Sequence, residues 1–138
     1  MAGLQAVLLG GAAGSLVSPR ELDMPLTFEG ARAIGATLGS GVVMLFDDTI
    51  DLRQVLLRIA SFFRHETCGQ CVPCRVGAVR QQEALQRLVK AEPLGSVTGE
   101  LRLLGEIAQA MRDASICGLG QTAASAVESA IQRWSLFS

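Results

Sequence analysis

The chain has 138 residues, which suits one domain or a small pair of domains and leaves no room for a separate nucleotide-binding domain. Its 12 Lys and Arg nearly balance 13 Asp and Glu, and no block of like charge occurs, so we expect no nucleic-acid partner. No apolar run approaches the roughly 18 residues of a membrane span, and no basic residue precedes the apolar start. We therefore expect a cytoplasmic chain without membrane insertion.

The first 49 residues are predicted to form a small α/β unit. Residues 4–9 and 42–46 are short apolar runs bounded by turn signals, which is typical of buried strands. Thr27 is the predicted N-cap of a short helix that runs through Ala33. The glycines between 10 and 14 favour a turn, because GGAAG matches neither the dinucleotide fingerprint nor the phosphate-binding loop.

Residues 50–138 have the pattern of four amphipathic helices. The first is predicted from residue 52, because Leu52, Leu56, Ile59 and Phe63 share one face. The others are predicted over 74–91, over 98–114 with Thr98 as N-cap, and over 122–134. Short connections between such helices favour a bundle in which each apolar stripe faces a common core.

The four cysteines have a spacing that points to an iron–sulfur cluster. Cys68, Cys71 and Cys74 fall within seven residues, and Cys117 follows 43 positions later. Three thiolates from one loop and one from a distant segment can hold the four corners of a [4Fe–4S] cluster. We expect Cys68 and Cys71 between the first two helices, Cys74 at the start of the second, and Cys117 between the third and fourth.

Three neighbouring residues suit the same site. Gly69 permits a close approach to the cluster and offers a backbone N–H, and Pro73 ends the loop where the second helix begins. Gly118 is expected to allow a similar approach beside the fourth cysteine, together with Gly120. Backbone N–H groups at such positions stabilise a negatively charged cluster.

Two other interpretations remain open on the residues alone. The four cysteines could hold zinc in a structural interaction domain, although zinc sites more often use two separate pairs of ligands. They could also be inert buried thiols. His65 precedes Cys68 by three residues, but a lone His in the last turn of a helix is more often a capping residue than a ligand.

The cysteine segments resemble the NADH-binding flavoprotein subunits of respiratory complex I, NAD-dependent formate dehydrogenases and soluble hydrogenases. The resemblance is carried by ETCGQCVPCRVG at 66–77 and SICGLGQTA at 115–123. Upstream, the stretches at 10–11, 22–26, 38–41 and 47–49 are similar to the β-grasp domain that precedes the cluster bundle in that family. The family commonly carries Lys and Glu where this chain has Gln70 and Val76.

The resemblance implies an α+β, mainly α fold: a partial β-grasp unit over 1–49 and a four-helix bundle with the cluster over 50–138. It implies that Cys68, Cys71, Cys74 and Cys117 bind one [4Fe–4S] cluster. FMN and NAD(H) are then expected on a partner domain or chain, with another iron–sulfur subunit as a further partner. The chain alone is expected to relay electrons between flavin and other redox centres of an oxidoreductase, and no residue of it is assigned to hydride transfer.

Overall fold

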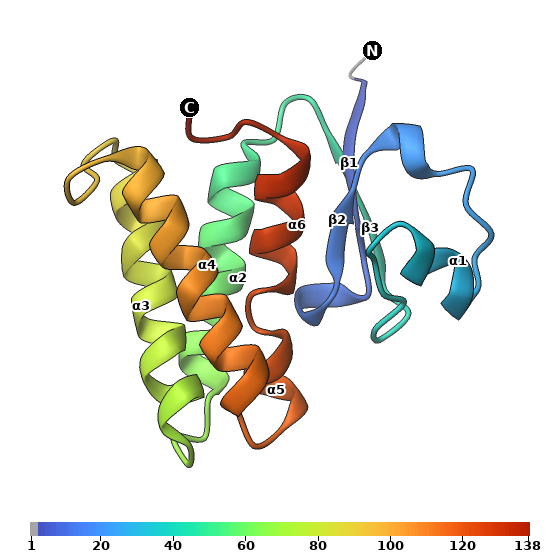
Figure 1. Ribbon diagram of the computed structural model, residues 1–138. Coiled ribbons are helices and arrows are strands. Elements are labelled where there is room, and N and C mark those ends of the chain that lie inside the picture. Colours follow the sequence, from blue (N-terminus) through green and yellow to red (C-terminus); the bar gives the residue numbers. More distant parts are fainter. Residues whose placement is uncertain (1–2) are drawn as a thin grey trace.

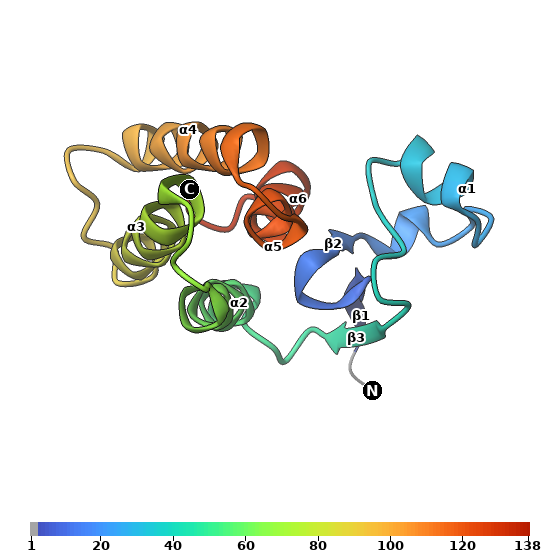
Figure 2. The same ribbon diagram turned by 90° about the horizontal axis from the view of Figure 1, so that it is seen from below.

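The computed structural model describes residues 3–138 and has three layers. A helical bundle lies on one side of a small sheet, and a short helix with its loops lies on the other (Figures 1 and 2). This is the mainly α, α+β architecture expected from the sequence. The elements in chain order are β1 (Leu4–Leu9), η1 (Gly11–Ala13), β2 (Ser15–Val17), η2 (Pro19–Glu21), α1 (Phe28–Ala33), β3 (Val43–Asp47), α2 (Leu52–Glu66), α3 (Val72–Val89), α4 (Val97–Ala114), α5 (Gly118–Thr122) and α6 (Ser125–Arg133).

The sheet has β1 in its centre, paired antiparallel with β2 and with β3. Successive side chains of a strand point to opposite faces. Ala6 and Leu8 therefore join the core shared with the bundle, whereas Val7 and Leu9 pack on the other face. β1 is apolar on both faces because both faces are covered.

The bundle is built from α2, α3, α4 and α6, whose apolar faces meet in one core. The predicted face of α2 is confirmed, since Leu52, Leu56, Ile59 and Phe63 are all buried. Thr27 caps α1 as predicted, accepting a hydrogen bond from the Gly30 N–H at 3.0 Å. The short predicted helix and the long amphipathic ones thus follow from capping and periodicity.

One strand and the start of one helix differ from the prediction. Strand β2 was not predicted, because three residues after a glycine turn carry no periodic signal. The N-cap of α4 is Ser96, and Thr98 lies inside the helix. Ser96 Oγ accepts the Gly99 N–H at 3.0 Å, and Gly95 at φ 81° turns the chain into it.

The predicted last helix over 122–134 is present as α6 but begins three residues later, and the short helix α5, which a break separates from it, was not predicted. The break falls at Ala123 and Ala124, where no Gly or Pro marks it in the sequence. The buried side chain of Gln81 in α3 donates to the Ala123 carbonyl at 3.0 Å. The Ala123 carbonyl, which accepts no hydrogen bond within a helix at this break, therefore accepts one from Gln81 of the neighbouring helix.

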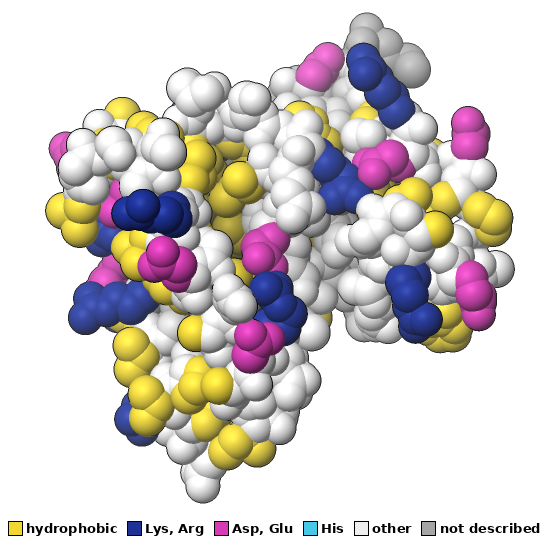
Figure 3. Space-filling model, viewed as in Figure 1, with side chains coloured by type: hydrophobic (Ala, Val, Ile, Leu, Met, Phe, Trp, Pro, Cys, Tyr) yellow, Lys and Arg dark blue, Asp and Glu magenta, His cyan; other side chains and the backbone are white. Residues whose placement is uncertain are grey.

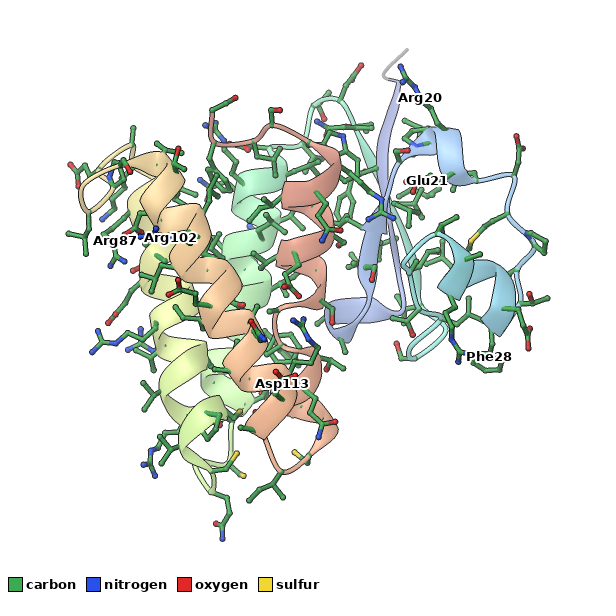
Figure 4. The ribbon with its side chains drawn as sticks, in the orientation of Figure 1. Arg20, Glu21, Phe28, Arg87, Arg102 and Asp113 are labelled. Atoms are coloured by element: carbon green, nitrogen blue, oxygen red, sulfur yellow. The ribbon has the colours of Figure 1, made fainter. Side chains whose placement is uncertain are left out.

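Sheet and bundle are tied together by polar contacts to α6. Ser129 Oγ accepts the Leu16 N–H of β2 at 2.8 Å in a buried site. Arg133 binds the carboxylate of Glu21 through Nε at 2.8 Å and Nη2 at 3.0 Å. Figure 4 labels Glu21 beside the strands of the sheet. The core is continuous between sheet and bundle, and the division of the chain at residue 49 stays a prediction.

Within residues 3–138, none of the helices combines the length and the apolar character needed to cross a lipid bilayer.

Candidate metal centre

All four cysteines border one cavity at one end of the bundle. The cavity has a volume of about 280 Å³ and is lined by Glu66, Thr67, Cys68, Gln70, Cys71, Cys74, Ile116, Cys117 and Leu119. It lies where α2 ends, α3 begins and α4 passes into α5, and Figure 4 shows sulfur atoms at this lower end of the bundle. Segments more than 40 residues apart in the sequence thus meet as the cysteine spacing predicts.

The four thiols differ in exposure. Cys74 is buried, Cys71 is half-buried, and Cys68 and Cys117 are exposed, and none of them forms a disulfide. Among the described residues, no three Cys, His, Asp or Glu side chains converge closely enough to hold a single metal ion. The thiols are therefore spread around the cavity.

Helix ends and caps place the cysteines of the first loop. Helix α2 ends at Glu66, and the loop that follows is tight, since Gly69 has φ 74° and its carbonyl accepts Arg75 Nη1 at 3.0 Å. Cys71 is the N-cap of α3, and Pro73 lies in the first turn, where its missing N–H costs no hydrogen bond. Cys74 therefore lies inside α3, two residues after the helix begins.

Backbone N–H groups stabilise the anionic form of Cys71. The N–H of Ile116 is the main cause of the lowered pKa of this thiol, followed by the N–H of Cys74. The lowered pKa favours the thiolate form of Cys71, which is the form of cysteine that binds metals.

Two hydroxyl groups beside the thiols were not predicted from the sequence. Thr67 Oγ1 lies 3.2 Å from Cys74 Sγ, and Ser115 Oγ is buried without a hydrogen-bond partner. The only sequence signal was their position, one residue before Cys68 and two before Cys117. A buried hydroxyl without a partner marks a place where a further group fits.

The glycines divide into two kinds. The Gly69 N–H donates to Thr67 Oγ1 at 3.3 Å, so its conformation shapes the loop. A Cβ added at Gly118 would touch no protein atom within 4 Å, whereas one added at Gly120 would collide with Ser115 and lie 2.8 Å from Cys74 Cβ. Close approach is thus required at Gly120.

Arg64 and His65, which precede the loop, make their hydrogen bonds away from it. Arg64 Nη1 donates to Gln82 Oε1 at 2.8 Å. His65 Nδ1 lies 2.9 Å from the Ser61 carbonyl in the last turn of α2, the position of a capping residue. His65 is not among the residues that line the cavity.

Exposed apolar side chains surround the cysteine loops. Val72, Val76 and Ile116 are 58%, 44% and 73% exposed. Figure 3 shows hydrophobic side chains gathered on the lower part of the bundle.

Comparisons with known proteins agree with this site. The NADH-ubiquinone oxidoreductase-F iron-sulfur binding region matches residues 54–136, which is more than half of the chain. The NADP-reducing hydrogenase subunit HndC of Solidesulfovibrio fructosivorans is 34% identical over 118 residues, covering 86% of this chain and 24% of that protein. An NADH-quinone oxidoreductase subunit of Rickettsia rickettsii is 32% identical over 132 residues, covering 95% of this chain and 30% of that protein.

Solved structures give the same result. The NAD+-reducing [NiFe]-hydrogenase in its H2-reduced state contains a chain that superposes with a TM-score of 0.82 and 33% identity, covering 95% of this chain and 22% of that one. The chain thus spans less than a third of the length of the relatives it matches. With the matched region covering both cysteine segments, the chain belongs to the NADH-ubiquinone oxidoreductase-F iron-sulfur binding family, whose cofactor is an iron–sulfur cluster.

Proposed function

We propose that this chain is an electron-transfer module that holds one [4Fe–4S] cluster on Cys68, Cys71, Cys74 and Cys117. The observation that carries the proposal is that all four cysteines border one cavity, although Cys117 is distant in sequence. The donor set fits the cluster, since four thiolates are its usual ligands. When bound, such a cluster takes up and releases single electrons.

The chain's own residues define what the protein adds to this chemistry. The N–H groups of Ile116 and Cys74 stabilise the thiolate of Cys71, and the first turn of α3 directs its free N–H groups toward the loop. Burial of Cys74 limits water at one corner, while Cys68 and Cys117 remain near the surface. An exposed corner favours electron exchange with a docked partner.

The proposed partners are a flavin-bearing, NADH-binding domain or subunit and another iron–sulfur subunit. The names of the relatives support this, because they are subunits of NADH-quinone oxidoreductases and of an NADP-reducing hydrogenase. The apolar rim formed by Val72, Val76 and Ile116 suits a protein contact beside the cluster. Electrons would pass between the flavin and further redox centres through this chain, and we propose that it acts in the cytoplasm.

The proposal is tested by metal analysis of the chain purified without oxygen. We expect about four irons and four sulfides per chain, the composition of a cluster on four thiolates, and a paramagnetic signal after reduction with dithionite. One zinc per chain and no iron would overturn the proposal and leave a structural zinc domain.

Ligand variants sharpen the test. Each of Cys68→Ser, Cys71→Ser, Cys74→Ser and Cys117→Ser should lower the iron content, because each removes one corner ligand. His65→Gln is the matched control, since it removes the one histidine near the loop and should leave four irons bound. Full iron content in a Cys117→Ser chain would contradict the ligand assignment.

A further inference from the structure

We propose that the hydroxyl groups of Thr67 and Ser115 donate hydrogen bonds to the thiolates that hold the cluster, Thr67 to that of Cys74, and so raise the reduction potential of the cluster. They are positioning residues of the redox centre and are not ligands. This inference rests on the proposed function, because it concerns a cluster held on these thiolates.

Ser115 is fixed by its backbone and leaves only its hydroxyl free. Its N–H donates to the Met111 carbonyl at 3.1 Å, and its own carbonyl accepts Gln121 Nε2 at 3.0 Å. The residue is 6% exposed, and Ser115 Oγ has no hydrogen-bond partner. A buried hydroxyl without a protein partner is costly, so its place in the fold favours a further acceptor.

The acceptor within reach of Ser115 is a cysteine thiolate. A Cβ added to Gly120 would collide with both Ser115 Oγ and Cys74 Cβ. Ser115 and Cys74 therefore pack against the same side of Gly120. The absence of a side chain at Gly120 thus allows Ser115 Oγ to reach the cluster.

Thr67 has the clearer geometry. Its Oγ1 lies 3.2 Å from Cys74 Sγ and accepts the Gly69 N–H at 3.3 Å. Since a ligating Cys74 has lost its proton, the only proton in the Thr67–Cys74 contact is that of the hydroxyl. Thr67 must therefore be the donor when the cluster is bound.

Hydrogen bonds to cluster thiolates favour the reduced state. Reduction adds one negative charge to the cluster and its ligands, and hydrogen bonds to charged acceptors strengthen as the charge grows. Each hydroxyl therefore stabilises the reduced cluster more than the oxidised one, which is how hydrogen bonds to sulfur set cluster potentials.

The test is a redox titration of the iron-loaded chain, followed by electron paramagnetic resonance. We expect Thr67→Val and Ser115→Ala each to lower the reduced-to-oxidised ratio at a fixed solution potential about tenfold, which equals 59 mV for a one-electron couple. Thr122→Val is the matched control, because its hydroxyl donates to the Gly118 carbonyl at 2.7 Å and not to a thiol. Thr67→Ser, which keeps a hydroxyl, should keep the wild-type potential.

Proton spectroscopy gives a second readout that does not depend on loading the Ser115 variant. In the wild-type reduced cluster, electron–nuclear double resonance should show exchangeable protons that disappear in D2O, and Thr67→Val should lack one of them. Wild-type potential and unchanged proton couplings in a fully loaded Thr67→Val chain would overturn the inference for Thr67. A Ser115→Ala chain with full iron and the wild-type potential, or one that no longer binds iron, would overturn it for Ser115. A wild-type chain without iron would instead overturn the proposed function.

Discussion

The two ends of the helical bundle satisfy their polar groups in different ways. At the end away from the cysteines, Glu100 is 1% exposed and its carboxylate binds Arg87 through two hydrogen bonds of 3.1 and 3.2 Å. At the cysteine end, four thiols surround a cavity and Ser115 Oγ is buried without a partner. One end is complete within the chain, and the other requires a bound group.

The same difference is visible in the helix ends. Helix α3 ends with the Ala91 N–H bonded to the Leu88 carbonyl and the Glu92 N–H bonded to the Arg87 carbonyl, the two hydrogen bonds of a Schellman motif. At the cysteine end, Cys71 and Cys117 are the N-caps of α3 and α5 but provide no side-chain cap. Positions where Ser or Asp would stabilise a helix hold thiols, as the proposed ligation requires.

The largest effect is expected from Gly120→Ala at the cysteine end. The added Cβ would lie 2.8 Å from Cys74 Cβ and collide with Ser115, and both Cys74 and Ser115 are buried. We expect a loss of about 3 kcal/mol in the free energy of unfolding, the upper range for overpacking, together with lowered iron content. Both are measured by denaturant titration and metal analysis.

The control for that variant is Gly105→Ala. Gly105 lies in α4 with nothing within 4 Å of an added Cβ, so this change should stabilise the helix by up to about 1 kcal/mol. Equal stability of Gly120→Ala and wild type would show that Ser115 and Cys74 leave room for a side chain at Gly120.

At the opposite end, Glu100→Gln breaks the buried pair with Arg87. It should lower the free energy of unfolding by about 3 kcal/mol, the lower end of the range for removing one partner of a buried ion pair, and leave the iron content unchanged. Glu106→Gln is the matched control, because Glu106 and Arg102 are 67% and 80% exposed at 3.9 Å. That exposed pair should contribute less than about 1 kcal/mol; Arg87 and Arg102 are both labelled in Figure 4.

The lowered pKa of Glu21 predicts how acid affects the contact between the sheet and the bundle. Hydrogen bonding to Arg133 is the main cause that lowers the pKa of Glu21 from 4.5 to about 2. A lowered pKa in the folded state contributes stability above pH 4.5, and this contribution is lost as the pH falls toward 2.

The measurement compares wild type with Glu21→Gln between pH 7 and pH 3. We expect the wild type to be more stable by about 2 kcal/mol at pH 7, with the difference shrinking below pH 4.5. Taking the difference cancels any acid loss of the cluster, which affects both chains. A difference independent of pH would contradict the role of the Glu21 carboxylate.

The smallest effect is expected at Ala91, which has φ 58°. A residue with a Cβ is strained in this left-handed conformation, and Gly is the usual residue at the C′ position. Ala91→Gly should therefore raise the free energy of unfolding by up to about 1 kcal/mol. Thermal unfolding of the two chains checks this, and a lower melting temperature for Ala91→Gly would contradict it.

Much of the fold could be predicted because its signals are local. The apolar run of β1, the stripe of α2 and the Thr27 cap are each readable within a few residues. The break between α5 and α6 could not be predicted, because it depends on a hydrogen bond from Gln81, which is 42 residues away from Ala123. Strand β2 likewise depends on the contact between Leu16 and Ser129.

For the site, the spacing of the cysteines was sufficient to predict that all four meet at one cavity. The role of Gly120 could only be separated from that of Gly118 once Ser115 and Cys74 were placed in space. The hydroxyls of Thr67 and Ser115 were missed because a hydroxyl beside a cysteine has no spacing rule, and its direction is set by the ends of α2 and α4.

The most direct test of the central claim is an anaerobic reductive titration that counts electrons per chain. A [4Fe–4S] cluster on the four cysteines predicts uptake of about one electron per four irons, with the signal lost in Cys117→Ser. A wild-type chain that takes up no electrons while holding stoichiometric zinc would contradict the account.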